Sequence, residues 1–242
     1  MEIRGIRFAD RVFRLLERVE YRRADTLEEK HAIFRMRYDA YKRAGTVELG
    51  ASGMFNDALD ESDNAWLIGL RIDGELASAL RLHVAAAPGV PLPVTAAFPN
   101  ILEPLLNAGR TVIDGTRFAA KLEFSHRFSE LPYLTLRPCF LAGEFFGADF
   151  ITAACLPEHQ TFYRRMFGGF PWCEDPKPYP LFKPPMVLIG HDCKALRASS
   201  YQRYPFFASA PPERARLFSR SSTSTGDVFK TIGRTVNATA TA

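Results

Sequence analysis

An acid and a base interrupt an otherwise apolar stretch at residues 112–119, whose sequence is VIDGTRFA. The apolar residues at its two ends predict a β-strand, with Asp114 and Arg117 near its middle. A carboxylate in such a place can accept a proton, and an arginine can bind a carboxylate or stabilise negative charge. The alternative is an exposed ion pair on an edge strand.

Other charged residues could join this pair. Arg81 lies in SALRLHV, a strand pattern that is otherwise apolar, and a buried arginine needs an anionic partner. Asp57 and Asp60 lie three apart in a polar loop, where they are either turn residues or partners for arginines or an ammonium group. Arg37 and Tyr41, four apart on a predicted helix, share one face, although a solvated arginine beside a half-buried tyrosine also fits.

The charged residues of this set balance one another, with as many arginines as aspartates. A buried charge is tolerated when an opposite charge neutralises it. We therefore predict one electrostatic network that supports a site, and an inert structural network is the alternative. Its members are Arg37, Arg81, Arg117, Asp57, Asp60 and Asp114.

The elements that must position this network alternate between helices and strands. Residues 26–29, TLEE, form a capping box that predicts a helix running to Gly45, and Asp73-Gly74 between two apolar stretches predicts a hairpin. This order predicts a mixed α/β sheet in one domain. The expected elements are helices at 3–20, 27–45, 99–108, 133–147 and 157–169, strands at 21–25, 65–72, 75–84, 111–119, 149–156, 172–179 and 185–192, and a basic, aromatic loop at 121–131.

The charge is unevenly distributed along the chain. The net charge is +4, yet residues 194–242 hold eight Lys and Arg against two Asp and Glu, which leaves residues 1–193 at −2. The basic charge is therefore weak evidence for nucleic acid, and no nucleic-acid motif accompanies it. We divide the chain into an amphipathic helix at 1–20, a globular domain at 21–193 and a basic, largely disordered tail at 194–242. Within the tail, ERARLF at 213–218 is compatible with one short docked helix, and the composition indicates disorder from Ser219.

Several classes of protein and site are disfavoured by what the sequence lacks. It has no run of 18 apolar residues, so we expect no transmembrane segment. The first 20 residues carry arginines throughout and no apolar block, so we expect a cytoplasmic protein. The four cysteines form no C-x-x-C pair, and we therefore expect reduced thiols and no metal site.

Four short motifs, in this order and at these distances, resemble a known enzyme family. They are RYDAY at 37–41, DALD at 57–60, ALRL at 79–82 and DGTRF at 114–118. The sequence resembles the acyl-homoserine-lactone (autoinducer) synthases and, more closely, the N-acyl amino acid synthases. Residues 154–170, ACLPEHQTFYRRMFGGF, resemble the latter too. The resemblance covers about residues 20–193 and implies the GNAT-type N-acyltransferase fold for the domain at 21–193.

The resemblance also implies roles for the charged residues. It implies catalytic roles for Asp114, Arg117 and Arg81, and substrate-binding roles for Arg37, Tyr41, Asp57 and Asp60. The match departs at Asp114, where the family usually has glutamate, so we expect proton transfer through water, with backbone N–H groups of a splayed fourth strand as oxyanion donors. The lactone synthases carry a tryptophan shortly after the helix aromatic, and KRAGTVELG at 42–50 has none. This favours the amide-forming branch.

The segment after the strand at 112–119 bears on the acyl donor. It has no Gly-rich phosphate loop, which disfavours free acyl-CoA. Lys121 and Arg127 suit an acidic acyl carrier protein, although ordinary solvated charges fit equally well. The resemblance implies the same donor, a phosphopantetheine thioester with no bound cofactor. We predict an N-acyltransferase that joins a fatty acyl chain to the amino group of an amino acid. The alternatives are an autoinducer synthase that uses S-adenosylmethionine and a catalytically silent GNAT-fold binding module.

Overall fold

The computed structural model describes residues 7–167 and 171–220, and in these residues the strands form one sheet in the order β1-β2-β3-β4-β5-β7-β6. Neighbouring strands are antiparallel except β4 and β5, which are parallel. The mixed α/β fold is therefore confirmed. The strands are β1 Val19–Arg23, β2 Ala65–Ile72, β3 Glu75–Ala85, β4 Val112–Ala120, β5 Phe150–Cys155, β6 Pro171–Lys177 and β7 Met186–Asp192.

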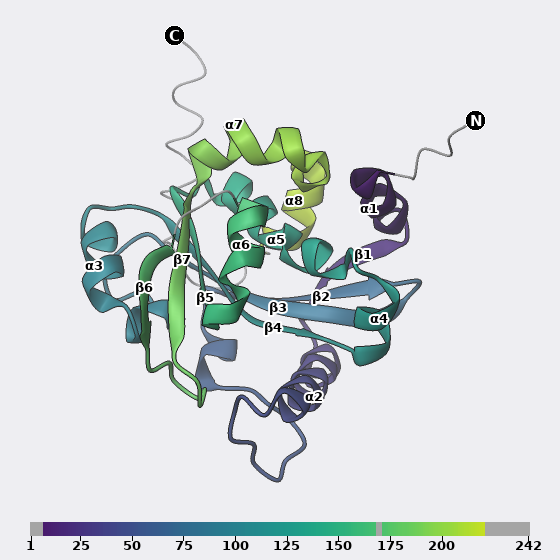
Figure 1. Cartoon of the computed structure of the whole chain (residues 1–242), viewed down its shortest axis with the longest axis horizontal. Coiled ribbons are helices and arrows are strands. Elements are labelled where there is room, and N and C mark those ends of the chain that lie inside the picture. Colours follow the sequence, from purple (N-terminus) through teal and green to yellow (C-terminus); the bar gives the residue numbers. More distant parts are fainter. Residues whose placement is uncertain (1–6, 168–170, 221–242) are drawn as a thin grey trace.

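Helices cover both faces of the sheet: α2 lies on one side, and α5, α8 and α1 lie on the other (Figure 1). The α-helices are α1 Phe8–Leu16, α2 Leu27–Ala44, α3 Pro99–Asn107, α4 Leu122–Arg127, α5 Leu131–Phe146, α6 Gln160–Phe167, α7 Cys193–Arg203 and α8 Pro211–Phe218. The 3₁₀ turns are η1 Ala58–Glu61, η2 Pro93–Ala96, η3 Pro157–His159 and η4 Pro205–Phe207. No described helix is long and apolar enough to cross a membrane.

Local sequence signals set the boundaries around the site. Thr26 and Glu29 form the predicted capping box of α2, and Gly45 ends the helix in the left-handed conformation, with φ 64°. Asp73 and Gly74 both have positive φ, 51° and 85°, as a two-residue hairpin turn between β2 and β3 requires. These elements fix where α2 and β3 face each other.

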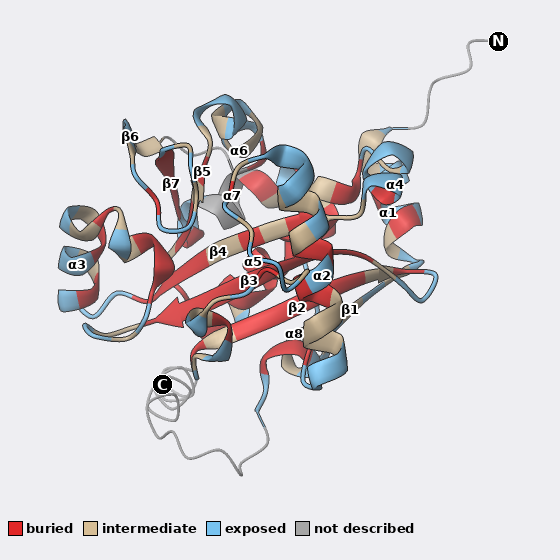
Figure 2. Cartoon of the chain, turned by 90° about the horizontal axis from the view of Figure 1, so that it is seen from below, coloured by how far each residue is buried: buried red, intermediate tan, exposed pale blue. Residues whose placement is uncertain are grey.

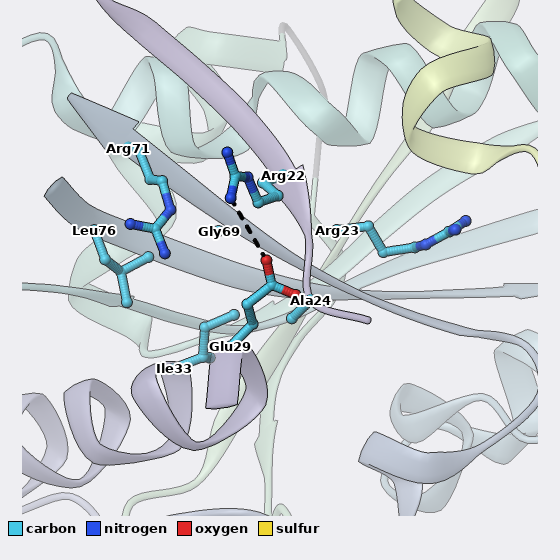
Figure 3. A pocket seen from close by; sticks show the side chains of 8 residues that line it. All are labelled: Arg22, Arg23, Ala24, Glu29, Ile33, Gly69, Arg71 and Leu76. Atoms are coloured by element: carbon cyan, nitrogen blue, oxygen red, sulfur yellow. Dashed lines mark ion pairs between the residues drawn. The ribbon is translucent and has the colours of Figure 1, made fainter. Parts of the chain in front are cut away.

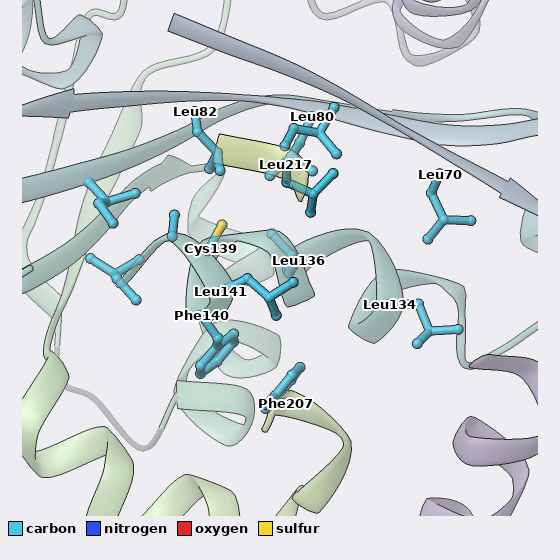
Figure 4. Close-up of a cluster of buried hydrophobic side chains, with 14 of the residues drawn as sticks. Leu70, Leu80, Leu82, Leu134, Leu136, Cys139, Phe140, Leu141, Phe207 and Leu217 are labelled. Carbon is cyan, nitrogen blue, oxygen red and sulfur yellow. The ribbon is translucent and has the colours of Figure 1, made fainter. Parts of the chain in front are cut away.

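The alternation of β3 separates an apolar face from a polar one. Leu80 and Leu82 pack with Cys139 and Leu141 of α5 (Figure 4). Arg81 and His83 point the other way, towards η1. Figure 2 shows that the strands in the middle of the sheet are buried. The polar face of β3 is therefore covered too, so its charged side chains need partners within the protein.

Two expected elements are corrected. The segment 121–131, expected as a loop, contains helix α4. The expected helix at 157–169 is a 3₁₀ turn followed by α6, which ends at Phe167, and residues 168–169 lie outside the described part of the chain. The expected N-terminal helix is confirmed over Phe8–Leu16 and ends before β1, which begins at Val19, while its expected residues 3–6 lie outside the described part of the chain.

Residues 193–218 form α7, η4 and α8, which corrects the expectation of a largely disordered tail over 194–218, and α8 confirms the short docked helix expected at ERARLF. Phe207 is fully buried and stacks on Phe140 of α5, with ring centroids 3.9 Å apart. The buried Arg137 of α5 donates to the carbonyl oxygens of Phe206 at 2.6 Å and Ala208 at 2.8 Å. Aromatic side chains in this segment thus bury enough apolar surface to fold it onto α5, which its basic, Ser-rich composition did not indicate. The rest of the expected tail, residues 221–242, lies outside the described residues.

Candidate active site

Three arginines converge on two aspartates on the polar face of β3. Arg37 Nη1 lies 2.8 Å from Asp60 Oδ1, and both side chains are fully buried. Arg81 Nη1 lies 2.6 Å from Asp57 Oδ1 and 3.0 Å from Asp60 Oδ1. Arg117 Nε donates to Asp57 Oδ2 at 3.2 Å. Burial opposes the charge of Asp57, but Arg81 and Arg117 outweigh it and hold the pKa of this carboxyl well below its usual range.

The two aspartates also build the turn that holds them. Asp57 Oδ1 accepts a hydrogen bond from the N–H of Leu59 at 2.9 Å, and Asp60 Oδ2 accepts one from the N–H of Asp57 at 2.9 Å. They are the two members of a capping box on η1. The two sequence interpretations, turn residues and arginine partners, are therefore both correct.

A β-bulge in β4 directs Arg117 towards this cluster. Opposite β3, Arg81 pairs with Thr116 and Ala79 pairs with Ala119, so β4 holds one extra residue between these two pairs. Arg117 has φ 55°, which is unfavourable for a residue with a side chain. In a regular strand Arg117 would point to the opposite face from Thr116, towards α5. The bulge brings Arg117 to Asp57 instead, a use of strain that is common at functional sites.

Asp114 stands apart from the cluster, which corrects the expectation that it belongs to the ion-pair network. It is fully buried, and it makes no ion pair within the part of the chain that the structure describes. Its Oδ2 accepts a hydrogen bond from the backbone N–H of Val94 in η2 at 2.9 Å. Burial raises the pKa of Asp114 to about 7, against the opposing effects of this hydrogen bond and of Arg81. Asp114 can therefore exchange a proton near neutral pH.

His83 is a neighbour of Asp114 that the sequence did not single out. The two residues are opposite each other in the β3–β4 register and so share a face. His83 Nε2 lies 3.0 Å from the carbonyl oxygen of Leu59 and so carries the proton. His83 Nδ1 and Asp114 Oδ1 are buried and have no hydrogen-bond partner among the described residues. Burial lowers the pKa of His83 to about 3, so its imidazole is neutral.

A cleft opens where β4 and β5 separate. The two strands pair only over Val112–Asp114 and Phe150–Thr152 and then diverge. Between them lies a cleft of about 190 Å³. Divergence of two parallel strands leaves backbone groups free to bind a ligand. The cleft is lined by Tyr41, Ala44, Thr46, Gly115, Thr116, Arg117, Phe118, Ala154, Cys155, Leu156, His159, Tyr163, Tyr179, Phe182 and Met186.

Aromatic side chains enclose Arg117 at the wall of this cleft. The guanidinium carbon lies 5.1 Å from the ring centroids of both Phe55 and Phe182. The ring of Tyr41 is edge-on to both, and its hydroxyl donates to the carbonyl oxygen of Phe118 at 3.1 Å. Tyr179 also lines the cleft, and burial together with the charge of Asp114 raises its pKa. Of these residues the sequence singled out Tyr41 and Arg117.

The predicted site residues thus fall into two layers. Tyr41 and Arg117 line the cleft, whereas Arg37, Asp60 and Asp114 are buried behind it. A wholly buried side chain cannot contact a ligand in the cleft as the protein stands. Within the inner layer, Arg37 and Asp60 connect to Arg117 through Arg81 and Asp57, whereas Asp114 is not part of these ion pairs.

Lys121 and Arg127, the predicted carrier-protein contacts, lie away from the cleft. Lys121 lines a groove between α2 and α4, together with Arg35 and Arg43. Arg127 lines a separate depression that also contains Asp73. The structure therefore does not bring these two residues into one patch.

A further depression, drawn in Figure 3, lies between β1 and α2 and is unsuited to a substrate. Arg22, Arg71 and Glu29 surround it, and Arg22 lies 3.8 Å from Glu29. Its volume is about 10 Å³, no more than one water molecule requires. The cleft at β4 and β5 is the better candidate.

Comparison with known proteins agrees with this geometry. The family model of the N-acyl amino acid synthase FeeM matches residues 32–192, well over half of the 242 residues. No curated protein sequence matches the chain. The matched range contains every charged residue of the cluster, together with the strands that form the cleft.

Solved structures share the fold at low sequence identity. FeeM, an N-acyl amino acid synthase from uncultured soil microbes, has a TM-score of 0.63 at 18% identity and covers 78% of this chain and 98% of its own. The AHL synthase LasI has a TM-score of 0.54 at 13% identity and covers 86% and 98%. BjaI, a CoA-dependent acyl-homoserine lactone synthase, has a TM-score of 0.52 at 12% identity and covers 85% and 91%. The predicted GNAT-type fold is confirmed.

Proposed function

Because the chain belongs to the FeeM family of N-acyl amino acid synthases, we propose that it transfers a fatty acyl chain from an acyl carrier protein to the amino group of an amino acid. Family membership makes the protein an N-acyltransferase, and the proposal concerns its donor and acceptor. The observation that carries it is the cleft between the diverging strands β4 and β5, beside a buried cluster of charges.

The reaction requires an amine, a thioester and an acceptor for one proton. The amino nitrogen loses a proton and attacks the thioester carbonyl carbon, which forms a C–N bond and places negative charge on the carbonyl oxygen. Collapse of this intermediate breaks the C–S bond, and the sulfur leaves with a second proton from nitrogen as a thiol. Backbone N–H groups of β4 beyond Asp114, where β5 has separated, are suited to stabilise the oxyanion.

Asp114 is the proposed proton acceptor, acting through intervening groups. Its carboxyl is fully buried and does not line the cleft, so direct contact with the amine is excluded in this conformation. Tyr179 lines the cleft and is electrostatically coupled to Asp114. The proposed route for the proton therefore runs from the amine through water to Asp114, whose pKa of about 7 suits a general base at neutral pH.

The remaining site residues are proposed to position the reacting groups. Arg81, almost wholly buried, holds Asp57 and Asp60 against β3. Arg37 holds Asp60 from α2. Tyr41 reaches the cleft from the same helix. Because Arg37 and Asp60 are buried, we propose that they act on the substrate through these neighbours.

The donor proposal rests on the segment that follows β4. Helix α4 begins directly after Lys121, without a glycine-rich turn to hold a pyrophosphate. A carrier protein delivers its thioester on a phosphopantetheine arm and needs no such turn. Acyl-CoA remains the rival donor, because BjaI, which shares the fold, is CoA-dependent.

The acceptor proposal separates the protein from autoinducer synthases. KRAGTVELG at 42–50 follows Tyr41 and lacks the tryptophan that the resembled lactone synthases carry there. S-adenosylmethionine is therefore the less favoured acceptor. The intact arginine–aspartate cluster likewise disfavours a catalytically silent binding module, for which a broken cluster was expected.

The test is a product analysis with the purified protein. Acyl carrier proteins loaded with chains of 8 to 16 carbons are incubated with the twenty standard amino acids, and in parallel reactions acyl-CoA replaces the carrier or S-adenosylmethionine replaces the amino acids. Mass spectrometry should detect N-acyl amino acids, formed faster from the carrier. Formation of acyl-homoserine lactone, or a preference for acyl-CoA, would overturn the acceptor or the donor proposal respectively. Lipid extracts of cells that overexpress the protein provide the corresponding test in vivo.

A further inference from the structure

The charged cluster beside the cleft carries an excess of positive charge. Three guanidinium groups, those of Arg37, Arg81 and Arg117, meet two carboxylates within ion-pair distance, those of Asp57 and Asp60. Asp114 was expected to balance the third arginine, but its carboxylate accepts a hydrogen bond from a backbone N–H instead. Excess charge in a buried cluster is costly unless an ion of opposite sign approaches it. The cluster therefore favours the binding of one more anion.

Arg117 is the member of the cluster that faces the cleft. It donates to Asp57 through Nε and Nη2. Its Nη1 has no hydrogen-bond partner within residues 7–167 and 171–220. Nη1 is also not one of the buried atoms without a partner, so it is accessible. Phe55 and Phe182 hold the guanidinium from two sides. One N–H-bearing edge of a fixed cation is thus available to a ligand in the cleft.

We infer that Arg117 Nη1 binds the carboxylate of the acceptor amino acid and thereby positions it in the cleft. This inference rests on the proposed function, because it assigns the part of the acceptor that does not react. An α-amino acid carries its carboxylate one carbon away from its nitrogen. The contact with Arg117 therefore fixes the nitrogen within the same cleft, next to the point where β4 and β5 separate. Orientation of this kind raises the rate of attack on the thioester.

The same contact assists the loss of the amine proton. A bound carboxylate offsets the positive field of Arg117, one of the groups that oppose the raised pKa of Asp114. Asp114 then accepts a proton more readily when a zwitterionic acceptor is present. The acceptor brings both the negative charge that the cluster lacks and the proton that Asp114 takes. A simple amine or an amino acid ester brings no such charge.

The test compares acids with esters. Wild-type protein is supplied with acyl carrier protein and, in separate reactions, each of the twenty standard L-amino acids or its methyl ester. For the acids that are acylated, kcat/KM should exceed that of the ester by about 10- to 100-fold, the ratio expected for one hydrogen bond to a charged group. Esters acylated as well as acids would overturn the inference and leave the proposed function intact. No N-acylation of any acid would overturn both.

Two arginine variants separate binding from structure. Arg117→Lys keeps a cation near Asp57 and removes the Nη1 edge, so the acid-to-ester ratio should fall at least about 10-fold, with a raised KM for the acid. Arg18→Lys is the matched control, because Arg18 also bonds an aspartate, Asp73, but at the exposed hairpin. It should leave the ratio unchanged. Equal loss for acids and esters in folded Arg117→Lys would show a structural role only and reject the inference.

Discussion

Asp57 and Arg117, sixty positions apart in the sequence, are joined by two hydrogen bonds that converge on one carboxylate oxygen. Asp57 caps η1, and Arg117 occupies the bulge of β4. The contact therefore ties the loop before the hairpin to the strand that borders the cleft. Since the backbone of Arg117 is in an unfavourable conformation, with φ 55°, this ion pair helps to hold the bulge.

The inner ion pair should contribute strongly to stability. In Asp60→Asn the fully buried guanidinium of Arg37 loses its carboxylate partner. Breaking a buried ion pair by removing one partner costs about 3–5 kcal/mol. Asp73→Asn, which removes the partner of the exposed Arg18, should cost about 0–1 kcal/mol. Urea unfolding of both variants measures this difference in the free energy of unfolding. Similar small losses of stability in both would contradict a strong contribution from the Arg37–Asp60 pair.

The stability of the fold should depend on pH through Asp114. Its pKa is about 7 in the folded protein and about 4 in an unfolded chain, so between these values the folded state holds more protons. The contribution of Asp114 is thus greatest at low pH, and it falls as pH rises from about 4 to 7. Asp114→Asn should therefore become more stable relative to wild type across this range, by on the order of 4 kcal/mol.

Urea unfolding of wild type and Asp114→Asn between pH 4 and pH 8 provides this measurement. His83 has a lowered pKa and favours folding as pH rises through its unfolded value of about 6.5, but it is present in both proteins and cancels in the difference. A constant difference between the two unfolding curves would show that Asp114 has an ordinary pKa.

Asp114→Asn should also lower turnover without loss of the fold. Asparagine keeps an oxygen for the N–H of Val94 and cannot accept the amine proton. A general base typically contributes roughly 10²- to 10⁴-fold in rate. Wild-type kcat/KM should rise with pH around a midpoint near 7, while the variant should lack this step and partly recover at high pH, where the amine is already deprotonated. A normal rate in folded Asp114→Asn would make Asp114 a structural residue.

The sequence was sufficient to predict the order of elements and most of the charge cluster. Capping residues, the Asp73-Gly74 turn and the alternation of β3 each depend on local chemistry, which a single sequence displays. The presence of Arg81 in an apolar strand correctly indicated acidic partners. The motif order also identified the family.

What the sequence did not predict depends on contacts between distant segments. The charge balance grouped Asp114 with Arg81, but it could not reveal that Asp114 bonds the N–H of Val94. Val94 belongs to a proline-rich segment without a helix or strand pattern. A regular strand predicts the wrong face for Arg117, because the bulge is set by pairing with β3. Tyr179 and Phe182 reach the cleft from a second proline-rich segment, where clustered aromatic residues were the available signal.

The two residues predicted to bind the carrier protein, Lys121 and Arg127, lie at separate places on the surface. Lys121 lies in a groove of about 370 Å³ beside Arg35 and Arg43, on the other side of the α2 C-terminus from Tyr41 and Ala44, which line the cleft. Arg127 lies in a different depression. If the carrier binds over the groove, Lys121→Glu should raise its KM more than Arg127→Glu does. One exposed ion pair is worth about 0.2–1 kcal/mol, so the rise from losing one is about 1.5- to 5-fold.

The control reaction uses a short acyl-pantetheine thioester, which has no acidic protein attached. Its kcat/KM should be unchanged in both variants, because neither residue lines the cleft. The effect of Lys121→Glu on the carrier should also shrink at high salt, since screening removes exposed charge interactions. Lys194→Glu, exposed at the start of α7 and lining neither the cleft nor the groove, matches the charge change and should alter neither donor. Equal losses with carrier and pantetheine thioester would place the defect inside the enzyme, because a docking surface affects only the donor that it touches.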